Sequence, residues 1–515
     1  MMMIESVVSV VFVVATILAG AEMLTKIQLN GYRKGKSLHI IPYSLKDVIE
    51  ALALVIIGIA IVMLTFMSLA VMYPVTLFLL LSIIAYKVIC YAKMRTRFKF
   101  THRGFRVYIS LITLIALLHI TMLVLVDTLW ALRILQVSTV IFAPVIVVIV
   151  NAALMPFELL NNEKYIKRTK IKLSGIKAVR IGITGSYGKT SCKNILATML
   201  SKKYKVFSTP ENYNTPMGMC LSVKKMTGDE EVIIAEMGAR RQGDVKKLCD
   251  IMRPEYAIIT GVGCQHLSEF GNIDKIYNTK RELTEAIPTT GFVVFNGDDE
   301  GATRMCSNFY GAKSIVGTST MLDVYARNLK LSTAGSTFEI IGLGDKIAAN
   351  TKLLGRHNVV NILMCATIAK KLGVCESDIA IAISEIRPIA HRLEILKNSK
   401  GITVIDDSYN ANVVGANFAL ETLRLFSGRR VVFTQGIIEM GKLTKSANRK
   451  LGMHIASVAD IVILVGKNAS LMFDGLDETG FTGKIYRYSA FKEAVENLPN
   501  ILEQGDTLLI QNDLP

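Results

Sequence analysis

Charged residues are scarce in this chain of 515 residues. They make up 20% of the sequence, whereas hydrophobic residues make up 51%, and a soluble protein of this length normally has about 25% charged residues. The eight cysteines form no CxxC pair and have no histidine at zinc-binding spacing. Internal repeats and low-complexity tracts are also lacking. These absences exclude a disordered chain, a collagen-like chain and a small disulfide-stabilised scaffold, and they favour a membrane protein with free thiols in a reducing cytosol.

The hydrophobic excess lies in residues 1–157. Five stretches there are apolar for long enough, about 17 to 25 residues, to cross a hydrocarbon core of about 30 Å as helices. Only Glu5 precedes the first stretch and no basic segment does, so we interpret this stretch as a retained span rather than a cleaved signal peptide. A tight hairpin is expected at Pro74, and the spans lack clustered buried charge, so they do not indicate a transport path. The predicted spans are 4–24, 51–72, 74–92, 106–126 and 134–154.

Positive charges follow alternate spans, and the other two loops are almost uncharged. Positively charged loops stay cytoplasmic, so the N-terminus is predicted outside and everything after the fifth span inside. Residues 1–172 hold 18 Lys and Arg against 7 Asp and Glu, which accounts for 11 of the net charge of +17. The basic balance therefore indicates topology and attraction to anionic lipid, not nucleic-acid binding. The three clusters contain Lys26, Arg33, Lys34, Lys36 and Lys46, then Lys93, Arg95, Arg97, Lys99, Arg103 and Arg106, then Lys164, Lys167, Arg168, Lys170 and Lys172.

From about residue 177 the pattern changes to short β-branched runs that alternate with helical segments. Such alternation is typical of a parallel sheet with helices on both faces. Residues 301–350 contain small polar turns and short strands, and we predict an inserted β-rich segment there. A second α/β set begins after Pro388. The predicted strands are 179–184, 232–236, 256–260, 292–296, 402–405, 431–434, 461–465 and 507–510, with an amphipathic helix over 191–203.

A glycine-rich loop follows the first of these strands and reads G-I-T-G-S-Y-G-K-T over residues 182–190. The backbone N–H groups of such a loop can surround phosphate oxygens, and the N-terminus of the next helix adds positive potential. Lys189 would then reach the β- and γ-phosphates, and the Thr190 hydroxyl would ligate Mg²⁺. The motif predicts ATP and Mg²⁺ as cofactors, although Ile183 stands where a strict Walker motif has glycine. The predicted nucleotide-binding residues of the loop are Gly185, Ser186, Gly188, Lys189 and Thr190.

The predicted architecture combines a multi-span α-helical membrane domain with α/β domains. The membrane domain covers 1–157 with about five transmembrane helices, and a basic linker covers 158–176. A P-loop parallel-sheet ATPase domain follows over 177–387. A smaller Rossmann-like domain occupies 388–515.

With this form of loop, the sequence resembles the Mur ligase family. Further motifs of the family follow in order, and the resemblance covers about 178–515. The last motif resembles the branch of the family that adds D-alanyl-D-alanine. The matching segments are T-P-E-N-Y-N-T (209–215), A-E-M-G (235–238), H-L-S-E-F-G (266–271), T-K-R-E (279–282), G-R-H-N-V-V-N (355–361), H-R-L-E (391–394) and D-D-S-Y-N-A-N (406–412).

The resemblance implies an amide-forming ligase that uses ATP to make an acyl phosphate, with two Mg²⁺ sites. Thr190 and Glu236 would hold the first ion, and His266 with a carbamylated Lys280 would hold the second. Carbamylation would replace a repelling ammonium by an anionic oxygen ligand, which suits a hard cation. Taken alone, Lys280 would be a solvated helix lysine and His266 a hydrogen-bonded loop histidine.

The same resemblance implies which residues take part in catalysis. Asn214 would contact the transferred phosphate or the acceptor. Asp298 and Asp299 show no such match, and we interpret them as an ordinary turn. The predicted catalytic residues are Lys189, Lys280, His266, Asn214 and Arg392.

The adenosine and the γ-phosphate would be bound mainly by later motifs. Asn358 and Asn361 offer amide groups that suit an adenine edge, and helix capping is the simpler alternative for them. By the family pattern, Arg392 would contact the γ-phosphate, Asp407 the ribose and Tyr409 the adenosine. A plain turn after a strand is the alternative for the aspartates at 406–407.

The predicted function is an ATP-dependent C–N ligase on the cytoplasmic side of the plasma membrane. It would join an amino acid or short peptide to a carboxylate of a peptidoglycan-type envelope precursor, nucleotide- or lipid-linked. The uridine-nucleotide domain of the family has no counterpart before the loop, so neither substrate is assigned. A ligase for an amino-acid polymer such as poly-γ-glutamate, and a scaffold that binds nucleotide without turnover, are the alternatives. The expected partners are the lipid bilayer, the precursor and the amino-acid donor, with other envelope-synthesis membrane proteins as further candidates and no nucleic acid.

Overall fold

The computed structural model describes residues 2–29, 31–32, 45–94, 96–210, 213–397, 401–409 and 412–511. Some predictions lie partly outside these residues, namely the basic residues at 33–36 and 95 and the centres of the motifs at 209–215 and 406–412. The chain divides into two compact units, Met1–Lys164 and Tyr165–Pro515.

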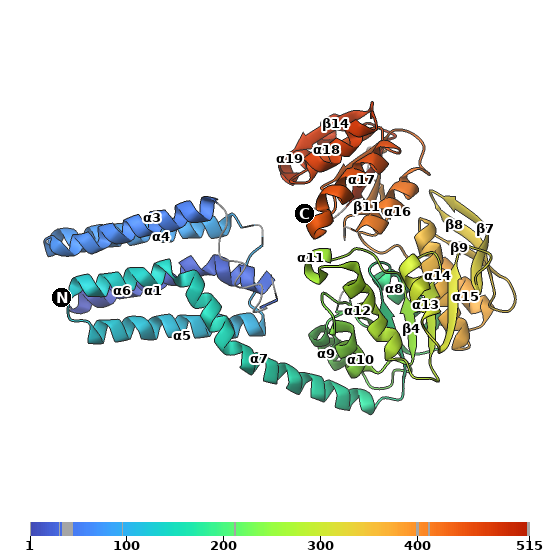
Figure 1. Cartoon of the computed structure of the whole chain (residues 1–515), viewed down its shortest axis with the longest axis horizontal. Coiled ribbons are helices and arrows are strands. Elements are labelled where there is room, and N and C mark those ends of the chain that lie inside the picture. The colour runs from blue at the N-terminus through green and yellow to red at the C-terminus, as the bar shows by residue number, and fades with distance from the viewer. Residues whose placement is uncertain are drawn as a thin grey trace. The chain divides into compact units, whose positions relative to one another are not determined.

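The first unit is helical in its described part (Figure 1). Among the described residues, five helices are long and apolar enough to cross a membrane, and α7 is the last of them. Its final turns belong to the second unit. The helices are α1 (Met2–Leu29), α3 (Leu45–Met63), α4 (Leu69–Ala92), α5 (His102–Leu125), α6 (Leu129–Ile141) and α7 (Ala143–Ser174), with a 3₁₀ turn at Leu64–Phe66.

Two prolines place helix boundaries differently from the prediction. Pro74 lies inside α4, and the turn before that helix is at Met67 and Ser68, both with extended backbone. Pro144 follows a break at Phe142 and separates α6 from α7. Pro144 has no N–H for the carbonyl of Val140, so a single helix through 134–154 would lose that bond. The fifth predicted span is therefore divided between two helices.

A buried ion pair lies inside the first unit, so the prediction that the spans lack clustered buried charge was wrong. Nη2 of Arg133, on α6, donates to both carboxylate oxygens of Glu5, on α1, at 2.8 and 2.9 Å. Tyr73 also donates to Glu5 at 2.6 Å, and Gln136 accepts from Arg133 at 2.6 Å. Their side chains are buried, and pairing offsets the cost of burying the charges. The sequence interpretation had placed Arg133 in a loop, whereas helix packing brings it against α1.

After the end of α7, the second unit contains a nine-stranded sheet in the order β2-β3-β1-β4-β5-β6-β7-β8-β9. Pairing is parallel from β2 to β7, and β8 and β9 add antiparallel strands at one edge (Figure 1). The predicted β-rich segment thus extends the same sheet. The strands are β1 (Val179–Thr184), β2 (Val206–Ser208), β3 (Val232–Glu236), β4 (Tyr256–Ile259), β5 (Phe292–Asn296), β6 (Ala312–Gly317), β7 (Val324–Ser332), β8 (Gly335–Ile341) and β9 (Ile347–Thr351).

Helices cover both faces of this sheet, which confirms the predicted α/β class. Ile234 of β3 belongs to a core with α8 and α14, whereas the neighbouring Ile233 belongs to a core on the other face with α9, α10 and the end of α7. This alternation follows from the two-residue period of a strand. The helices are α8 (Lys189–Leu200), α9 (Pro216–Lys224), α10 (Asp244–Met252), α11 (Leu267–Phe270), α12 (Ile273–Glu285), α13 (Glu300–Ser307), α14 (Arg356–Lys371) and α15 (Glu376–Glu385).

A six-stranded sheet forms the rest of the second unit, in the order β10-β11-β15-β12-β13-β14. All neighbours are parallel except β10, which is antiparallel to β11. Its strands are β10 (Glu394–Lys397), β11 (Thr403–Asp407), β12 (Arg430–Thr434), β13 (Ile461–Val465), β14 (Lys484–Tyr488) and β15 (Thr507–Gln511). Its helices are α16 (Val413–Leu423), α17 (Thr444–Ala456), α18 (Ala469–Glu478) and α19 (Phe491–Ile501).

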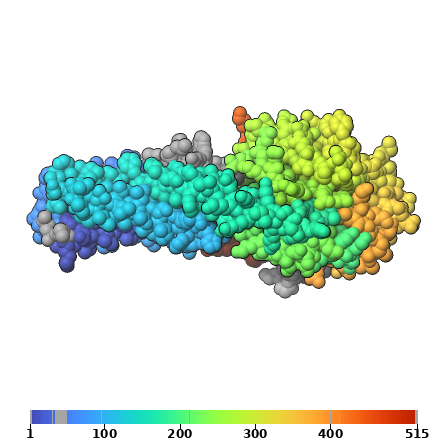
Figure 2. All heavy atoms as spheres, turned by 90° about the horizontal axis from the view of Figure 1, so that it is seen from below, coloured from blue at the N-terminus to red at the C-terminus, as the bar shows by residue number. Residues whose placement is uncertain are grey.

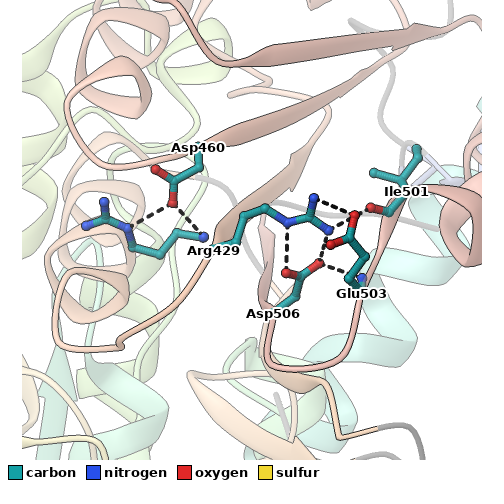
Figure 3. A network of polar contacts seen from close by, with 6 residues as sticks. Arg429, Asp460, Ile501, Glu503 and Asp506 are labelled. Carbon is teal, nitrogen blue, oxygen red and sulfur yellow. Dashed lines mark hydrogen bonds and ion pairs between the residues drawn. The ribbon is translucent and has the colours of Figure 1, made fainter.

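An arginine holds two central strands of this sheet together at their N-terminal ends (Figure 3). Arg429 precedes β12 and donates to both carboxylate oxygens of Asp506, just before β15, at 2.9 and 2.8 Å. It also donates to Glu503 at 2.9 Å and to the carbonyl of Ile501 at 3.1 Å. Asp506 is buried, so this two-point contact supplies the partner that a buried carboxylate needs.

Candidate active site

The glycine-rich loop connects the C-terminal end of β1 to the N-terminus of α8, as predicted for phosphate binding. Gly188 caps α8 with φ 75°, and Gly185 has φ 155°. A Cβ atom on Gly185 would lie 2.0 Å from Oγ1 of Thr260, and one on Gly188 would lie 2.9 Å from Oδ1 of Asn361. Both positions therefore need glycine, for space and for backbone conformation.

Hydrogen bonds from the surrounding loops hold the glycine-rich loop in place. Ser186 donates to the carbonyl of Gly263 and accepts from its N–H, both at 2.9 Å. The Tyr187 hydroxyl donates to Asp299 at 2.6 Å, and Asp299 also accepts from the N–H of Val262 at 3.0 Å. Asp299 caps α13 as well. It is thus a support of the loop and more than the ordinary turn residue that the sequence suggested.

Glu236 gathers three polar side chains at the C-terminal end of β3, and its own side chain is buried. Thr190 donates to Glu236 at 2.9 Å, and Asn214 donates to its other oxygen at 2.9 Å. The structure thus brings together three residues that the motifs singled out. Lys193, which the sequence reasoning missed, places Nζ 3.8 Å from the same carboxylate. A lysine three residues after Thr190, on the same helix face, is the signal that could have revealed it.

Two further lysines lie near this cluster. Lys189 donates to the carbonyl of Gly185 at 2.7 Å, and desolvation, reinforced by the charge of Arg392, lowers its pKa. Lys280, on α12, is buried, and desolvation together with the charge of Lys189 lowers its pKa to about 7. Within the described part of the chain its ammonium forms no hydrogen bond or ion pair. Lys280 is therefore a buried amine and not a solvated helix lysine.

His266 lies at the boundary between the two sheet domains of the second unit. It caps the short helix α11 with φ 53°, and its Nδ1 bonds to the carboxylate of Glu439 from the C-terminal domain. The N–H of Ser268 also donates to the carbonyl of Glu439, at 3.1 Å. The structure thus pairs His266 with Glu439, and in the described residues it forms no hydrogen bond with Lys280.

Arg392 brings the C-terminal domain to the glycine-rich loop. Its Nη2 donates to the hydroxyl of Thr190 at 3.3 Å, and its guanidinium lies 4.5 Å from the ring centre of Tyr409. Asp407, at the end of β11, has its pKa raised to about 7 by desolvation, which the charge of Arg392 partly opposes. The predicted residues Arg392, Asp407 and Tyr409 therefore lie close together, and Arg392 links them to the glycine-rich loop.

Asn358 and Asn361 lie at the start of α14, buried against α8. Asn358 donates to the carbonyl of Leu354 at 2.9 Å, and Asn361 donates to Asn358 at 3.3 Å. His357 beside them was missed, although it belongs to the same motif. Its ring stacks on Phe418 at 4.8 Å, and burial with the charge of Arg392 lowers its pKa to about 4. Its Nδ1 is buried and has no hydrogen-bond partner in the described residues, so this nitrogen can form a hydrogen bond with a ligand.

Two family models match the second unit, the Mur ligase middle domain over residues 183–369 and the Mur ligase, glutamate ligase domain over residues 391–511. The UDP-N-acetylmuramoyl-tripeptide–D-alanyl-D-alanine ligase of Bacillus subtilis is 26% identical over 64% of this chain and 72% of that enzyme. The enzyme of the same name from Mycobacterium tuberculosis is 30% identical over 59% of this chain and 62% of that enzyme.

A similar solved structure is the MurF ligase of Thermotoga maritima in complex with ADP. Its TM-score is 0.61 at 24% identity, over 68% of this chain and 80% of that chain. This likeness supports the fold of the second unit.

Proposed function

We propose, from the premise that this chain belongs to the Mur ligase family, that it is an ATP-dependent ligase of peptidoglycan-type precursors. It would join an amino acid or short peptide to a carboxylate of the precursor. The relatives named above act, by their names, on a UDP-N-acetylmuramoyl tripeptide and D-alanyl-D-alanine, and these two compounds are the first substrates to test. The alignments leave 28% and 38% of those enzymes uncovered, so the substrates of this chain form part of the proposal.

The observation that carries the proposal is the convergence of cationic side chains at one end of the first sheet. Lys189, Lys193 and Arg392 lie around Thr190 and Glu236. A carboxylate that attacks the γ-phosphate of ATP brings two anions together, so fixed positive charge is needed where they meet. In the proposed sequence, a carboxylate oxygen bonds to the γ-phosphorus as ADP leaves. The amine then attacks the acyl carbon, and phosphate leaves.

The Mg²⁺ ions that the family implies would be held by residues of this cluster. Thr190 and Glu236 present oxygen atoms 2.9 Å apart, which fits a hard cation. A second ion would take His266 and a carbamate on Lys280, and the His266 ring would have to exchange Glu439 for the metal. When bound, the ions would neutralise phosphate charge.

The proposed location is the plasma membrane, with the N-terminus outside and the ligase domains in the cytoplasm. The five long apolar helices and the basic loops predicted from the sequence support it. The envelope precursor would be nucleotide- or lipid-linked and would reach the enzyme at this face of the bilayer.

A substrate panel with the purified full-length chain tests the function, with release of ADP and phosphate as the readout. We expect release only when an acceptor carboxylate and an amine donor are both present, with the muramoyl tripeptide nucleotide and D-alanyl-D-alanine tested first. Glutamate oligomers with glutamate test the polymer alternative. Equal release without either substrate would indicate a plain ATPase. ATP binding without turnover of any pair would indicate a scaffold.

A pair of lysine variants separates the site from the rest of the domain. Lys189→Met should lower turnover by at least about 100-fold, because the γ-phosphate loses a charge partner. Lys203→Met, beyond the other end of α8, should retain turnover, because this lysine contacts only the carbonyl of Gly373 and the ring of Tyr204 in the described residues.

A further inference from the structure

A basic hollow lies at the N-terminal ends of β1 and β4 in the first sheet, whereas the candidate active site lies at the C-terminal ends of the strands. Its volume is about 430 Å³, and it is bounded by the end of α7, the start of β1 and the turn after α10. Lys167, Lys170, Arg180 and Arg253 line it, together with Ile171, and no acidic residue among the described ones does. A hollow with charges of one sign attracts an anion.

The cations of this hollow have no direct acidic partner among the described residues, although Lys170 and Arg253 also line an adjoining pocket with Asp250, Glu255, Glu282 and Glu285. In the described part of the chain, the side chains of Lys167, Lys170 and Arg253 form no hydrogen bond or ion pair. Arg180 donates only to backbone carbonyls, those of Leu173 at 2.5 Å, Met252 at 3.2 Å and Ile176 at 3.3 Å.

The guanidinium of Arg180 is fixed and still has capacity to donate. Its Nη1 donates one hydrogen bond, to the carbonyl of Met252, and has a second hydrogen that can be donated. Glu255 acts on Arg180 electrostatically, but it does not line this hollow and forms no salt bridge with Arg180 in the described residues. Arg180 therefore offers a positioned positive charge in the lining of the hollow, beside the two lysines.

The backbone of Arg253, one of the residues that line the hollow, has a strained conformation. Arg253 follows α10 with φ 50° and ψ 65°, in the left-handed region. Glycine is the usual residue there, and other residues cost about 1 kcal/mol more. A long cationic side chain thus stands where glycine would relieve the strain. Strain of this kind is found where a side chain has a task.

Apolar side chains beside the lysines indicate an amphiphilic ligand. Ile171 is 63% exposed, and Tyr165 is also exposed on the same helix. α7 begins as an apolar span and continues into this mixed basic and apolar stretch, whose end lies at the surface of the second unit (Figure 2). Helices of such composition lie at the level of lipid headgroups, and basic clusters next to a span attract anionic lipids.

We propose that this hollow binds the phosphate group of an anionic membrane phospholipid. Arg180 would hold the phosphate, and Lys167, Lys170 and Arg253 would surround it. Ile171 would contact the glycerol and the upper acyl chain. The site is separate from the nucleotide site, because it lies at the N-terminal ends of β1 and β4 whereas the glycine-rich loop follows the C-terminal end of β1. The proposal does not depend on which reaction the enzyme catalyses.

Binding of short-chain lipids to the full-length chain in neutral detergent micelles tests the proposal by native mass spectrometry. We expect dioctanoyl phosphatidylglycerol to bind at least about tenfold more tightly than dioctanoyl phosphatidylcholine. The variant Lys167→Ala/Lys170→Ala/Arg253→Gly should lose that preference. The variant Lys164→Ala/Arg168→Ala/Lys177→Ala also removes three positive charges, all within residues 164–177 and none from the hollow, so it should bind within about threefold of the original chain.

Three outcomes would overturn the proposal. Equal losses in the two triple variants would show diffuse attraction to the basic segment instead of a site. Equal binding of both lipids would show that the phosphate charge is not recognised. Displacement of the lipid by an equal concentration of inorganic phosphate would identify a site for a soluble anion. Should the first triple variant fail to fold, Arg253→Gly alone gives the same comparison, because glycine relieves the strain at that position.

Discussion

Lys280 combines three properties at the scale of a single residue. It is buried, it has no partner for its ammonium among the described residues, and its pKa is about 7. An unfolded lysine has a pKa of about 10.4, so between these values the unfolded chain binds more protons and folding stability rises with pH. Near neutral pH a large share of the Lys280 side chain is a neutral amine, the form that reacts with carbon dioxide. Carbamylation would replace the buried ammonium by an anionic carbamate, an oxygen ligand that suits a hard cation.

The carbamate can be observed directly. In ¹³C-bicarbonate, we expect a carbamate signal by NMR that grows as the pH rises through about 7 and is missing in Lys280→Ala. Turnover of Lys280→Ala should fall by at least about 100-fold while ATP binding remains. Lys275→Ala changes an exposed lysine of the same helix and should keep both. Normal turnover of Lys280→Ala, or turnover unaffected by removing carbon dioxide, would contradict the assignment.

Other residues of the site could be found from the sequence only where a motif contained them. The glycines, Thr190 and Glu236 follow from spacing, because a phosphate loop and a strand-end carboxylate have local signatures. Lys193 and Asp299 have no such signature. Their roles come from burial and from partners 43 and 112 residues away in the chain, at Glu236 and Tyr187, and only tertiary packing brings these together.

At the scale of elements, the buried strands were the easiest to predict. β1, β3, β5 and β13 begin and end at the predicted residues, because strands buried on both faces are short runs of β-branched and other apolar residues between polar turns. The break at Phe142 was not predicted, since an apolar run gives no change of hydropathy where a helix stops. Strand order and the antiparallel β10 depend on long-range pairing, which no local pattern contains.

Substitution of Arg429 tests the contact between the starts of β12 and β15. Arg429→Met removes the partner of buried Asp506, so we expect the unfolding free energy of this domain to fall by about 2 kcal/mol. The neighbouring Arg430→Met is the matched control. Its partner Asp460 is 43% exposed, and exposed pairs contribute less than about 1 kcal/mol. Hydrogen exchange of the β12 and β15 amides in the full-length chain measures the loss of unfolding free energy in each variant. Equal effects would contradict the role assigned to Arg429.

At the scale of the whole molecule, charge and hydropathy describe two unlike halves. The first 172 residues carry 11 of the 17 net positive charges, and the family match lies entirely in the second unit. The number of long apolar helices could be predicted because span length is set by bilayer thickness. The side chains that hold the helices together could not, because Glu5 and Arg133 meet across 128 residues of sequence.

The proposed membrane orientation can be checked in intact cells. Met3 is 82% exposed at the start of α1, and Cys375 is an exposed thiol of the second unit. A membrane-impermeant maleimide should label Met3→Cys in intact cells, and Cys375 only after the membrane is opened. The reverse pattern would place the ligase domains outside.

The ion pair between Glu5 and Arg133 has a consequence for biosynthesis. Arg133, the cationic partner of Glu5, is translated 128 residues after Glu5. At about 5 to 20 residues per second, roughly 6 to 26 s separate the synthesis of the two residues, and Tyr73, which also donates to Glu5, is translated between them. A nascent chain that stops before α6 therefore lacks the cationic partner of Glu5.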